Sequence, residues 1–179
     1  MEHSAGTLTP PAVGLAYASR LIASGPLCDL FYGDQRVTAS RRTPFLAMTN
    51  SLVWTWLDGD EYSLRYPSSL RAELCLNEQP LYEIPYVGFC KGGEQFIWRR
   101  ISDKLRLVTA ELVREKCLQY EYRFYNQERT PLGTFKSQDL WNCRLGRRRP
   151  MPLYDFQGSL LELNLMWAFI LLQQFCKPD

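Results

Sequence analysis

The sequence predicts a mainly β protein, in which a closed antiparallel barrel of about twelve strands surrounds a hydrophobic helix near the C-terminus. Three observations support this prediction. The segment from Ser159 to Cys176 carries no polar stripe along its middle, and a helix that is apolar all round must be surrounded. From Leu27 onward, short runs of strand length alternate with turn residues. A sheet with one apolar face must cover it, and closure around the helix does so while removing exposed edges.

Length and composition indicate one globular domain. The chain has 179 residues, of which 46% are hydrophobic and 22% charged. The net charge of +2 does not point to nucleic acid, so a basic surface has to come from local clustering. We expect an arm over residues 1–26, with one short helix from Ala12 to Ser24 that ends at Gly25 and Pro26. The barrel domain is expected over residues 27–179.

The expected strands form hairpins around turn residues such as Gly33-Asp34 and Asp58-Gly59-Asp60. In CLQYEYRFY, the residues Tyr120, Tyr122 and Phe124 alternate with polar residues, which predicts one buried and one exposed face. The strand-like runs are LFYGDQRV, SLVWTWL with YSLRY, RAELCL with LYEIPY, EQFIWRRI with LRLVTAELV, CLQYEYRFY with LGTFKSQ, and DLWNCRL.

Two of these hairpins look like copies of one unit. AELCLNEQPLYEI and YRFYNQERTPLGTF share the order strand, Asn, polar residues, Pro-Leu and an aromatic or aliphatic residue. Their asparagines, Asn77 and Asn126, lie forty-nine residues apart. The pattern predicts a sheet built in two similar halves.

Both ends of the helix are marked in the sequence. Ser159 stands three residues before Glu162, which is the spacing of a capping box, and Lys177-Pro178 favours a helix end. A bilayer anchor is an alternative, because about 17 to 25 apolar residues can span a membrane. The polar residues Asn164 and Gln173 near the two ends favour burial inside the protein's own sheet.

The repeated hairpin form NEQPLYEI and NQERTPLGTF and the ending LYDFQGSLLELNLMWAFILLQQF resemble the tubby-like superfamily. This group includes the tubby C-terminal domain, the phospholipid scramblases and the LURP-one-related proteins. The resemblance implies a closed barrel around a hydrophobic helix and, for tubby proteins, binding of phosphoinositide headgroups by basic side chains. The chain departs from the scramblases, because Asp155 stands alone where their calcium segment is acidic and the cysteines are not clustered. Calcium is therefore not expected.

The most distinctive polar cluster lies in NCRLGRRRPMP, between the last expected strand and the helix. Guanidinium groups bind phosphate bidentately, so its arginines are candidates for holding a lipid headgroup or a nucleic-acid backbone. A solvated basic loop explains the same pattern. The pairs Arg41-Arg42 and Arg99-Arg100 would enlarge the patch if they fold nearby. The candidate lipid- or phosphate-binding residues are Arg144, Arg147, Arg148 and Arg149.

Other constellations argue against catalysis and metal binding. His3 is the only histidine and lies in the expected arm, which disfavours a Ser-His-Asp or Cys-His arrangement. The carboxylates of Asp58, Asp60 and Glu61 sit where a turn needs polar residues. No catalytic residue, metal or cofactor is expected. The five tryptophans are expected in the core, with the lining of a ligand cavity as the alternative: Trp54, Trp56, Trp98, Trp141 and Trp167.

The six cysteines lie at least fifteen residues apart, which excludes Cys-x-x-Cys pairs. Residues 1–14 lack a basic segment followed by an apolar run, so no secretory signal is expected. Reduced, buried thiols in the cytoplasm are therefore predicted, with a peripheral membrane or nuclear location left open. The cysteines are Cys28, Cys75, Cys90, Cys117, Cys143 and Cys176.

The function predicted from these observations is a non-catalytic, tubby-like adaptor or scaffold. It would bind a protein partner or anionic phospholipid headgroups through its outer surface. One alternative is a hydrophobic-ligand carrier or small enzyme with a lipocalin-like barrel. Another alternative is a nucleic-acid-associated regulator, which only the arginine loop supports. Nucleic acid is not the expected partner.

Overall fold

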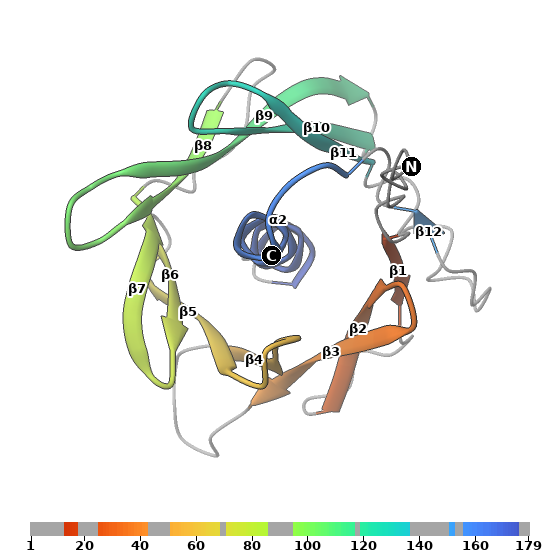
Figure 1. Cartoon of the computed structure of the whole chain (residues 1–179), viewed down its shortest axis with the longest axis vertical. Coiled ribbons are helices and arrows are strands. Elements are labelled where there is room, and N and C mark those ends of the chain that lie inside the picture. The colour runs from red at the N-terminus through yellow and green to blue at the C-terminus, as the bar shows by residue number, and fades with distance from the viewer. Residues whose placement is uncertain are drawn as a thin grey trace, which may run out of the picture.

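The computed structural model describes residues 13–17, 25–42, 51–68, 71–85, 95–116, 119–136, 151–152 and 156–175. Twelve strands in these ranges form one antiparallel sheet, and a helix follows them in the chain (Figure 1). From β1 to β11 each strand pairs with the next one in sequence, and β12 pairs with β1. The strands are β1 (Val13–Tyr17), β2 (Gly25–Tyr32), β3 (Gln35–Arg42), β4 (Ser51–Thr55), β5 (Glu61–Ser68), β6 (Arg71–Leu76), β7 (Gln79–Ile84), β8 (Gln95–Arg100), β9 (Arg106–Lys116), β10 (Gln119–Asn126), β11 (Pro131–Lys136) and β12 (Met151–Pro152).

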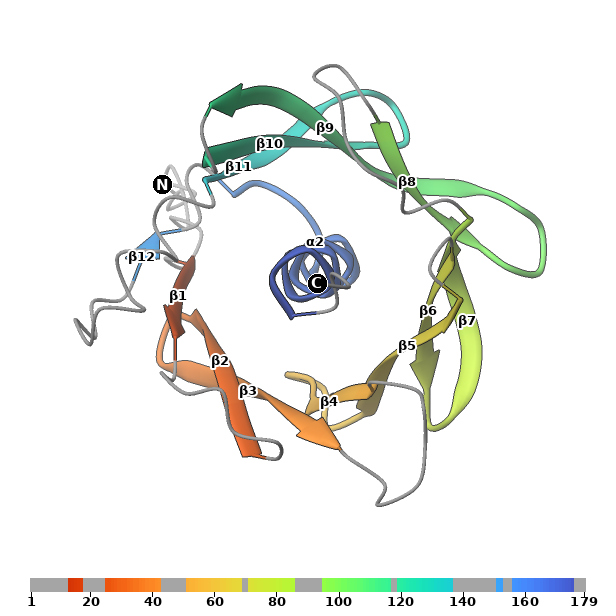
Figure 2. The same ribbon diagram turned by 180° about the vertical axis from the view of Figure 1, so that it is seen from behind.

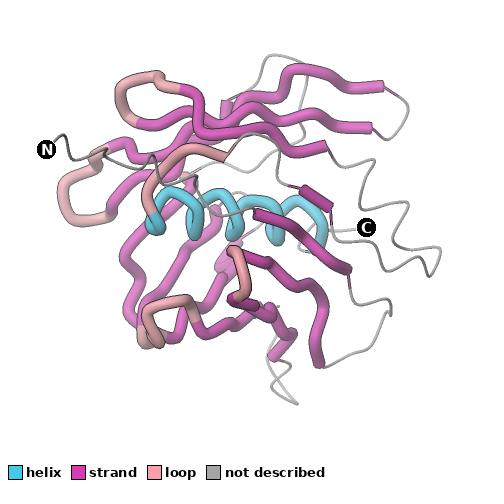
Figure 3. Tube along the Cα trace, turned by 45° about the vertical axis from the view of Figure 1, so that its right-hand side comes forward, coloured by secondary structure: helices cyan, strands magenta, loops and turns pink. Residues whose placement is uncertain are grey.

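The sheet curls around the helix α2 (Leu160–Phe175). Figures 1 and 2 show α2 in the middle of the curl from two opposite sides, and Figure 3 shows it running between strands. The mainly β prediction with one C-terminal helix is therefore confirmed. Closure is not: β11 and β12 are the two ends of the strand order, and no pairing joins them in the described ranges. In these residues the sheet is a curl with two edges.

The start of α2 is fixed by the capping box that the sequence predicts. The Ser159 backbone N–H donates to Glu162 Oε2 at 2.7 Å, and the Glu162 N–H donates back to Ser159 Oγ at 3.2 Å. Just upstream, the Gln157 N–H donates to the carbonyl of Leu132 in β11 at 2.9 Å. At Gly158 a Cβ would lie only 2.9 Å from Leu132 Cδ2. Glycine thus lets the chain pass close to β11 as it turns into the helix.

The core lies between α2 and the inner face of the sheet. Every side chain from Leu163 to Leu172 is buried, so the helix is covered around its whole circumference. The ring centroid of Phe169 lies 5.4 Å from that of Phe96 in β8, 5.1 Å from that of Tyr122 in β10 and 5.7 Å from that of Phe124 in β10. The alternation expected in β10 is confirmed by the burial of Tyr122 and Phe124. Edge-to-face aromatic contacts of this kind add to the energy of area burial.

Two polar groups of α2 have partners on opposite parts of the sheet. Asn164 Oδ1 accepts a hydrogen bond from Trp54 Nε1 of β4 at 3.0 Å. At the other end of the helix, Gln173 Oε1 accepts from the Tyr122 hydroxyl of β10 at 3.2 Å. Both bonds are buried, and a buried polar group that lost its partner would destabilise the fold. These bonds fix the rotation of an otherwise uniformly apolar helix.

The N-terminal helix expected from Ala12 to Ser24 is wrong for the residues described. Val13–Tyr17 form β1, which pairs with β2 from Val13↔Tyr32 to Tyr17↔Cys28. Val13, Gly14 and Tyr17 have a lower helix propensity than alanine and leucine, and pairing with β2 decides the conformation of this segment. β1 and β2 thus pair across the boundary expected at residue 26.

The two similar hairpins of the sequence share a bulge after their proline, but the registers differ: the residue before the asparagine pairs with Gln79 in the first hairpin and with Pro131 in the second. In the β6–β7 hairpin the pairing shifts at Pro80-Leu81, and in the β10–β11 hairpin it shifts at Pro131-Leu132. Their turns differ. Asn77 adopts a positive φ of 46° in a tight turn, whereas Asn126 accepts hydrogen bonds with its side chain, including one of 2.8 Å from the Thr130 N–H. The repeated unit is thus a bulged hairpin whose asparagines have different roles.

Candidate functional site: a cation cluster around Glu83

A row of charged side chains crosses the outer face of the sheet over five neighbouring strands. Directly opposed residues in a sheet share a face, and the register places one charged residue on each strand from β5 to β9. Arg65 faces Glu73, Glu73 faces Glu83, and Glu83 faces Arg99. The complete row is Arg65, Glu73, Glu83, Arg99 and Arg106.

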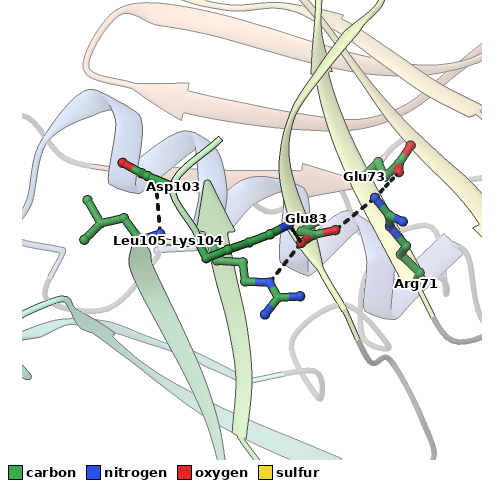
Figure 4. A network of polar contacts seen from close by, with 7 residues as sticks. Arg71, Glu73, Glu83, Asp103, Lys104 and Leu105 are labelled. Atoms are coloured by element: carbon green, nitrogen blue, oxygen red, sulfur yellow. Dashed lines mark hydrogen bonds and ion pairs between the residues drawn. The ribbon is translucent and has the colours of Figure 1, made fainter. Parts of the chain in front are cut away.

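Glu83 is the centre of this row and is only 3% exposed. Its Oε1 accepts from Arg99 Nε at 2.9 Å and from Lys104 Nζ at 2.9 Å. Its Oε2 lies 2.9 Å from Arg71 Nη2, and this same nitrogen lies 2.7 Å from Glu73 Oε1 (Figure 4). Two carboxylates on opposite strands repel each other. Arg71 offsets this repulsion because it bridges both.

Lys104 reaches Glu83 from the turn between β8 and β9. Its backbone has a φ of 59°, a conformation that is uncommon for residues other than glycine. The turn is held by the Arg100 N–H, which donates to the Leu105 carbonyl at 2.9 Å, and by Asp103 Oδ1, which accepts from the Leu105 N–H at 3.1 Å (Figure 4). The turn geometry therefore directs the ammonium group onto the buried carboxylate.

The cations keep Glu83 charged. Burial alone would raise the pKa of this carboxyl, but hydrogen bonds from Lys104 and Arg99 and the charge of Arg71 outweigh burial and lower the pKa below its ordinary value. Glu83 is thus ionised at neutral pH and is not suited to donate a proton. It is suited to hold three cationic side chains in fixed positions on the outer face.

These residues form a surface with an excess of positive charge. The side chains of Arg71, Arg99 and Lys104 are 43%, 34% and 57% exposed although their contacting atoms meet Glu83. Five cations stand against two carboxylates, which leaves a local charge of +3, more than the +2 of the whole chain. We call this the Glu83 surface, and it consists of Arg65, Arg71, Glu73, Glu83, Arg99, Lys104 and Arg106.

The arginines singled out from the sequence are distributed differently. Arg144, Arg147, Arg148 and Arg149 lie outside the described residues, so their phosphate-binding role stays a prediction. Arg99 belongs to the Glu83 surface, whereas its neighbour Arg100 pairs with Asp103 at 3.1 Å at the end of the hairpin. Arg41 lies in β3, which four strands separate from β8, so it does not join Arg99. The side chain of Arg42 is outside the described residues.

The other expectations about single residues concern packing. Of the three carboxylates expected in a turn, Asp58 has that role, because its Oδ1 accepts from the Asp60 N–H at 3.0 Å, whereas Glu61 is the first residue of β5. Four of the five tryptophans are buried in the core, and Trp141 lies outside the described residues: the buried ones are Trp54, Trp56, Trp98 and Trp167. Cys28 and Cys75, the cysteines within the described ranges, are buried. Burial raises the pKa of the Cys75 thiol, which disfavours the reactive thiolate at neutral pH.

Glu83 itself was not predicted from the sequence. The only local signal is that Glu73 and Glu83 each stand between two apolar or aromatic residues of a strand, which is also what any strand with one solvent-facing side shows. Within the described ranges, no helix is long and apolar enough to cross a bilayer. No family model, curated protein or solved structure matches the chain. The resemblance to the tubby-like superfamily therefore stays a prediction.

Proposed function

We propose that this chain is a non-catalytic binding module of the tubby-like type, which acts as an adaptor or scaffold through the outer face of its sheet. In this proposal the curl closes into a barrel, and the Glu83 surface contacts anionic phospholipid headgroups or an acidic protein partner. The observation that carries the proposal is the burial of α2 on all sides from Leu163 to Leu172. The side chains of the helix occupy the inside of the curl, which leaves the outer face for binding.

The same observation disfavours the carrier function. A lipocalin-like carrier needs an interior that a ligand can enter, whereas Phe169 and Trp167 of α2 are 0% and 1% exposed. The Glu83 surface in turn favours an anionic partner, because each cation near an anionic membrane contributes about 1 kcal/mol to binding. Arginine also matches the geometry of phosphate and carboxylate oxygens.

Vesicle flotation tests this function with two matched double variants. Arg65→Gln with Arg106→Gln removes two cations from the Glu83 surface without removing a contact to Glu83. Arg123→Gln with Arg129→Gln removes two exposed cations of the β10–β11 hairpin, away from that surface. On vesicles that contain phosphatidylserine or a phosphoinositide, the first variant should bind roughly thirtyfold more weakly than the wild type, and the control much less.

A third variant separates the Glu83 surface from the arginine loop. Arg147, Arg148 and Arg149 are changed to alanine together, and the same vesicles are used. Loss of binding in this variant alone would assign the membrane contact to the arginine loop. Equal loss in this variant and both double variants would indicate non-specific electrostatic attraction. If the wild-type protein does not bind anionic vesicles but binds an acidic protein segment through Arg65 and Arg106, the partner of the Glu83 surface is a protein and not a membrane.

A further inference from the structure

The turn between β8 and β9 carries an exposed serine next to the Glu83 surface. Ser102 lies in the turn that follows β8, and its side chain is exposed. Arg99 and Arg100 stand three and two positions before it. Serine kinases whose substrate groove is acidic select arginine two and three positions before the serine, because the positive charge of arginine complements the groove. The turn thus combines an accessible hydroxyl with the charge pattern of an arginine-directed kinase substrate.

We propose that Ser102 is a phosphorylation site and that a phosphate there weakens binding at the Glu83 surface. The modification concerns Ser102 alone, whereas its effect on binding rests on the proposed function. In the reaction, Ser102 Oγ attacks the γ-phosphorus of ATP on the kinase. The new Oγ–P bond forms as the bond from the γ-phosphorus to the bridging oxygen breaks, the hydroxyl proton passes to the kinase's catalytic base, and ADP leaves.

The turn is built so that a kinase can engage it. The side chain of Arg99 is 34% exposed and that of Arg100 is 42% exposed. The two arginines are the last two residues of β8, where the backbone is extended. The bonds that shape the tip come from the Arg100 N–H, which donates to the Leu105 carbonyl at 2.9 Å, and from Asp103, whose Oδ2 lies 3.1 Å from Arg100 Nη1 and whose side chain is 48% exposed. Exposed ion pairs of this kind contribute little to stability. Opening the tip leaves the Ile101 N–H, which donates to the Leu81 carbonyl at 2.9 Å, as the anchor of the hairpin to β7.

A phosphate at Ser102 would change the charges that the Glu83 surface presents. Phosphoserine adds about 1.5 to 2 negative charges at neutral pH, against a local excess of +3. Lys104 follows two positions later, and its ammonium group rests on Glu83 at 2.9 Å. The phosphate oxygens compete with Glu83 for Lys104 and with Asp103 for Arg100. Both the net charge and the arrangement of the cations therefore change toward weaker attraction of an anionic partner.

The first experiment measures the modification. Folded full-length protein is incubated with ATP and the catalytic domain of an arginine-directed serine kinase, and the phosphate is located by peptide mass spectrometry. We expect one phosphate at Ser102, loss of labelling in Ser102→Ala, and slower labelling in Arg100→Ala. Ser159 is an internal control, because it is exposed but has no arginine in the positions before it. Thermal melting of the product checks that the labelled chain is folded. Absence of phosphate at Ser102 overturns the proposal.

The second experiment measures the effect on binding with the vesicles described above. Phosphorylated protein should bind anionic vesicles about tenfold to thirtyfold more weakly than unmodified protein, since the phosphate adds about 1.5 to 2 negative charges. Ser102→Ala treated with kinase should bind like the untreated wild type. Phosphate at Ser102 with unchanged binding overturns the regulatory role. If unmodified protein does not bind vesicles but Ser102 is labelled, the proposed function fails and the modification site stands.

Discussion

Replacement of Phe169 by alanine tests whether α2 fills the inside of the sheet. Phe169 is 0% exposed and packs against three aromatic rings, from Phe96, Tyr122 and Phe124, with centroids between 5.1 and 5.7 Å away. Loss of a buried phenylalanine side chain costs about 3–5 kcal/mol. The upper part of that range, about 4–5 kcal/mol, is expected here, because rings held on two strands cannot collapse into the space left behind.

For a chain of this size, each kcal/mol lowers the melting temperature by about 2–4 °C, so Tm should fall by about 8–20 °C. Urea unfolding followed by circular dichroism and tryptophan fluorescence measures the free energy of unfolding. Leu160→Ala is the matched control, because Leu160 lies in the first turn of the same helix but is 42% exposed. It should cost less than about 1 kcal/mol. Equal losses in the two variants would refute the packing of α2 inside the curl.

The remaining predictions concern the Glu83 surface and the helix cap. Glu83→Gln should lower the free energy of unfolding by about 2 kcal/mol at neutral pH, since three charge-assisted contacts are lost but their cationic partners are partly exposed. Glu111→Gln, which removes an exposed pair with Arg129, should cost under about 0.5 kcal/mol in the same urea titration. The folded-state pKa of Glu83 is lowered from 4.5, so the stabilisation by its carboxylate is complete above pH 4.5 and is lost as the pH falls through the lowered pKa. Thermal melts across that pH range should show the Tm values of wild type and Glu83→Gln approaching each other. A constant difference in Tm would contradict the role assigned to Glu83. Ser159→Ala should cost about 1 kcal/mol and Ser159→Gly only a few tenths, as measured by urea unfolding.

The elements that the sequence predicts well are those specified by local pattern. A helix that is apolar all round, with Ser159 and Glu162 at its start, indicates both its ends and its buried position. Alternation in β10 likewise predicts which face of the strand meets the core. The local pattern does not predict β1, because VGLAY is short and its strand conformation depends on pairing with β2 and β12, which lie elsewhere in the sequence.

The candidate site depends on register and therefore could not be read from the sequence. Glu83 meets Arg99 and Glu73 only because three strands align in one register, and a one-residue slip would turn these side chains to the other face. That register follows a bulge at Pro80-Leu81. Lys104 reaches the site through a positive φ that nothing in its local sequence demands. The arginine repeat from Arg147 to Arg149 is conspicuous as a motif, whereas the Glu83 surface is assembled from single residues on separate strands.

The position of α2 after every described strand has a consequence for biosynthesis. While the chain emerges from the ribosome, β1 to β11 are complete at Lys136, but the helix that covers their inner face ends at Phe175. At about 5–20 residues per second, the thirty-nine intervening residues take roughly 2 to 8 s to be added. During that interval Phe96, Tyr122 and Phe124 have no ring from α2 to pack against. A nascent sheet with an uncovered apolar face is the kind of surface that chaperones bind, so stalling the ribosome between residues 136 and 160 should trap this chain in its most chaperone-dependent form.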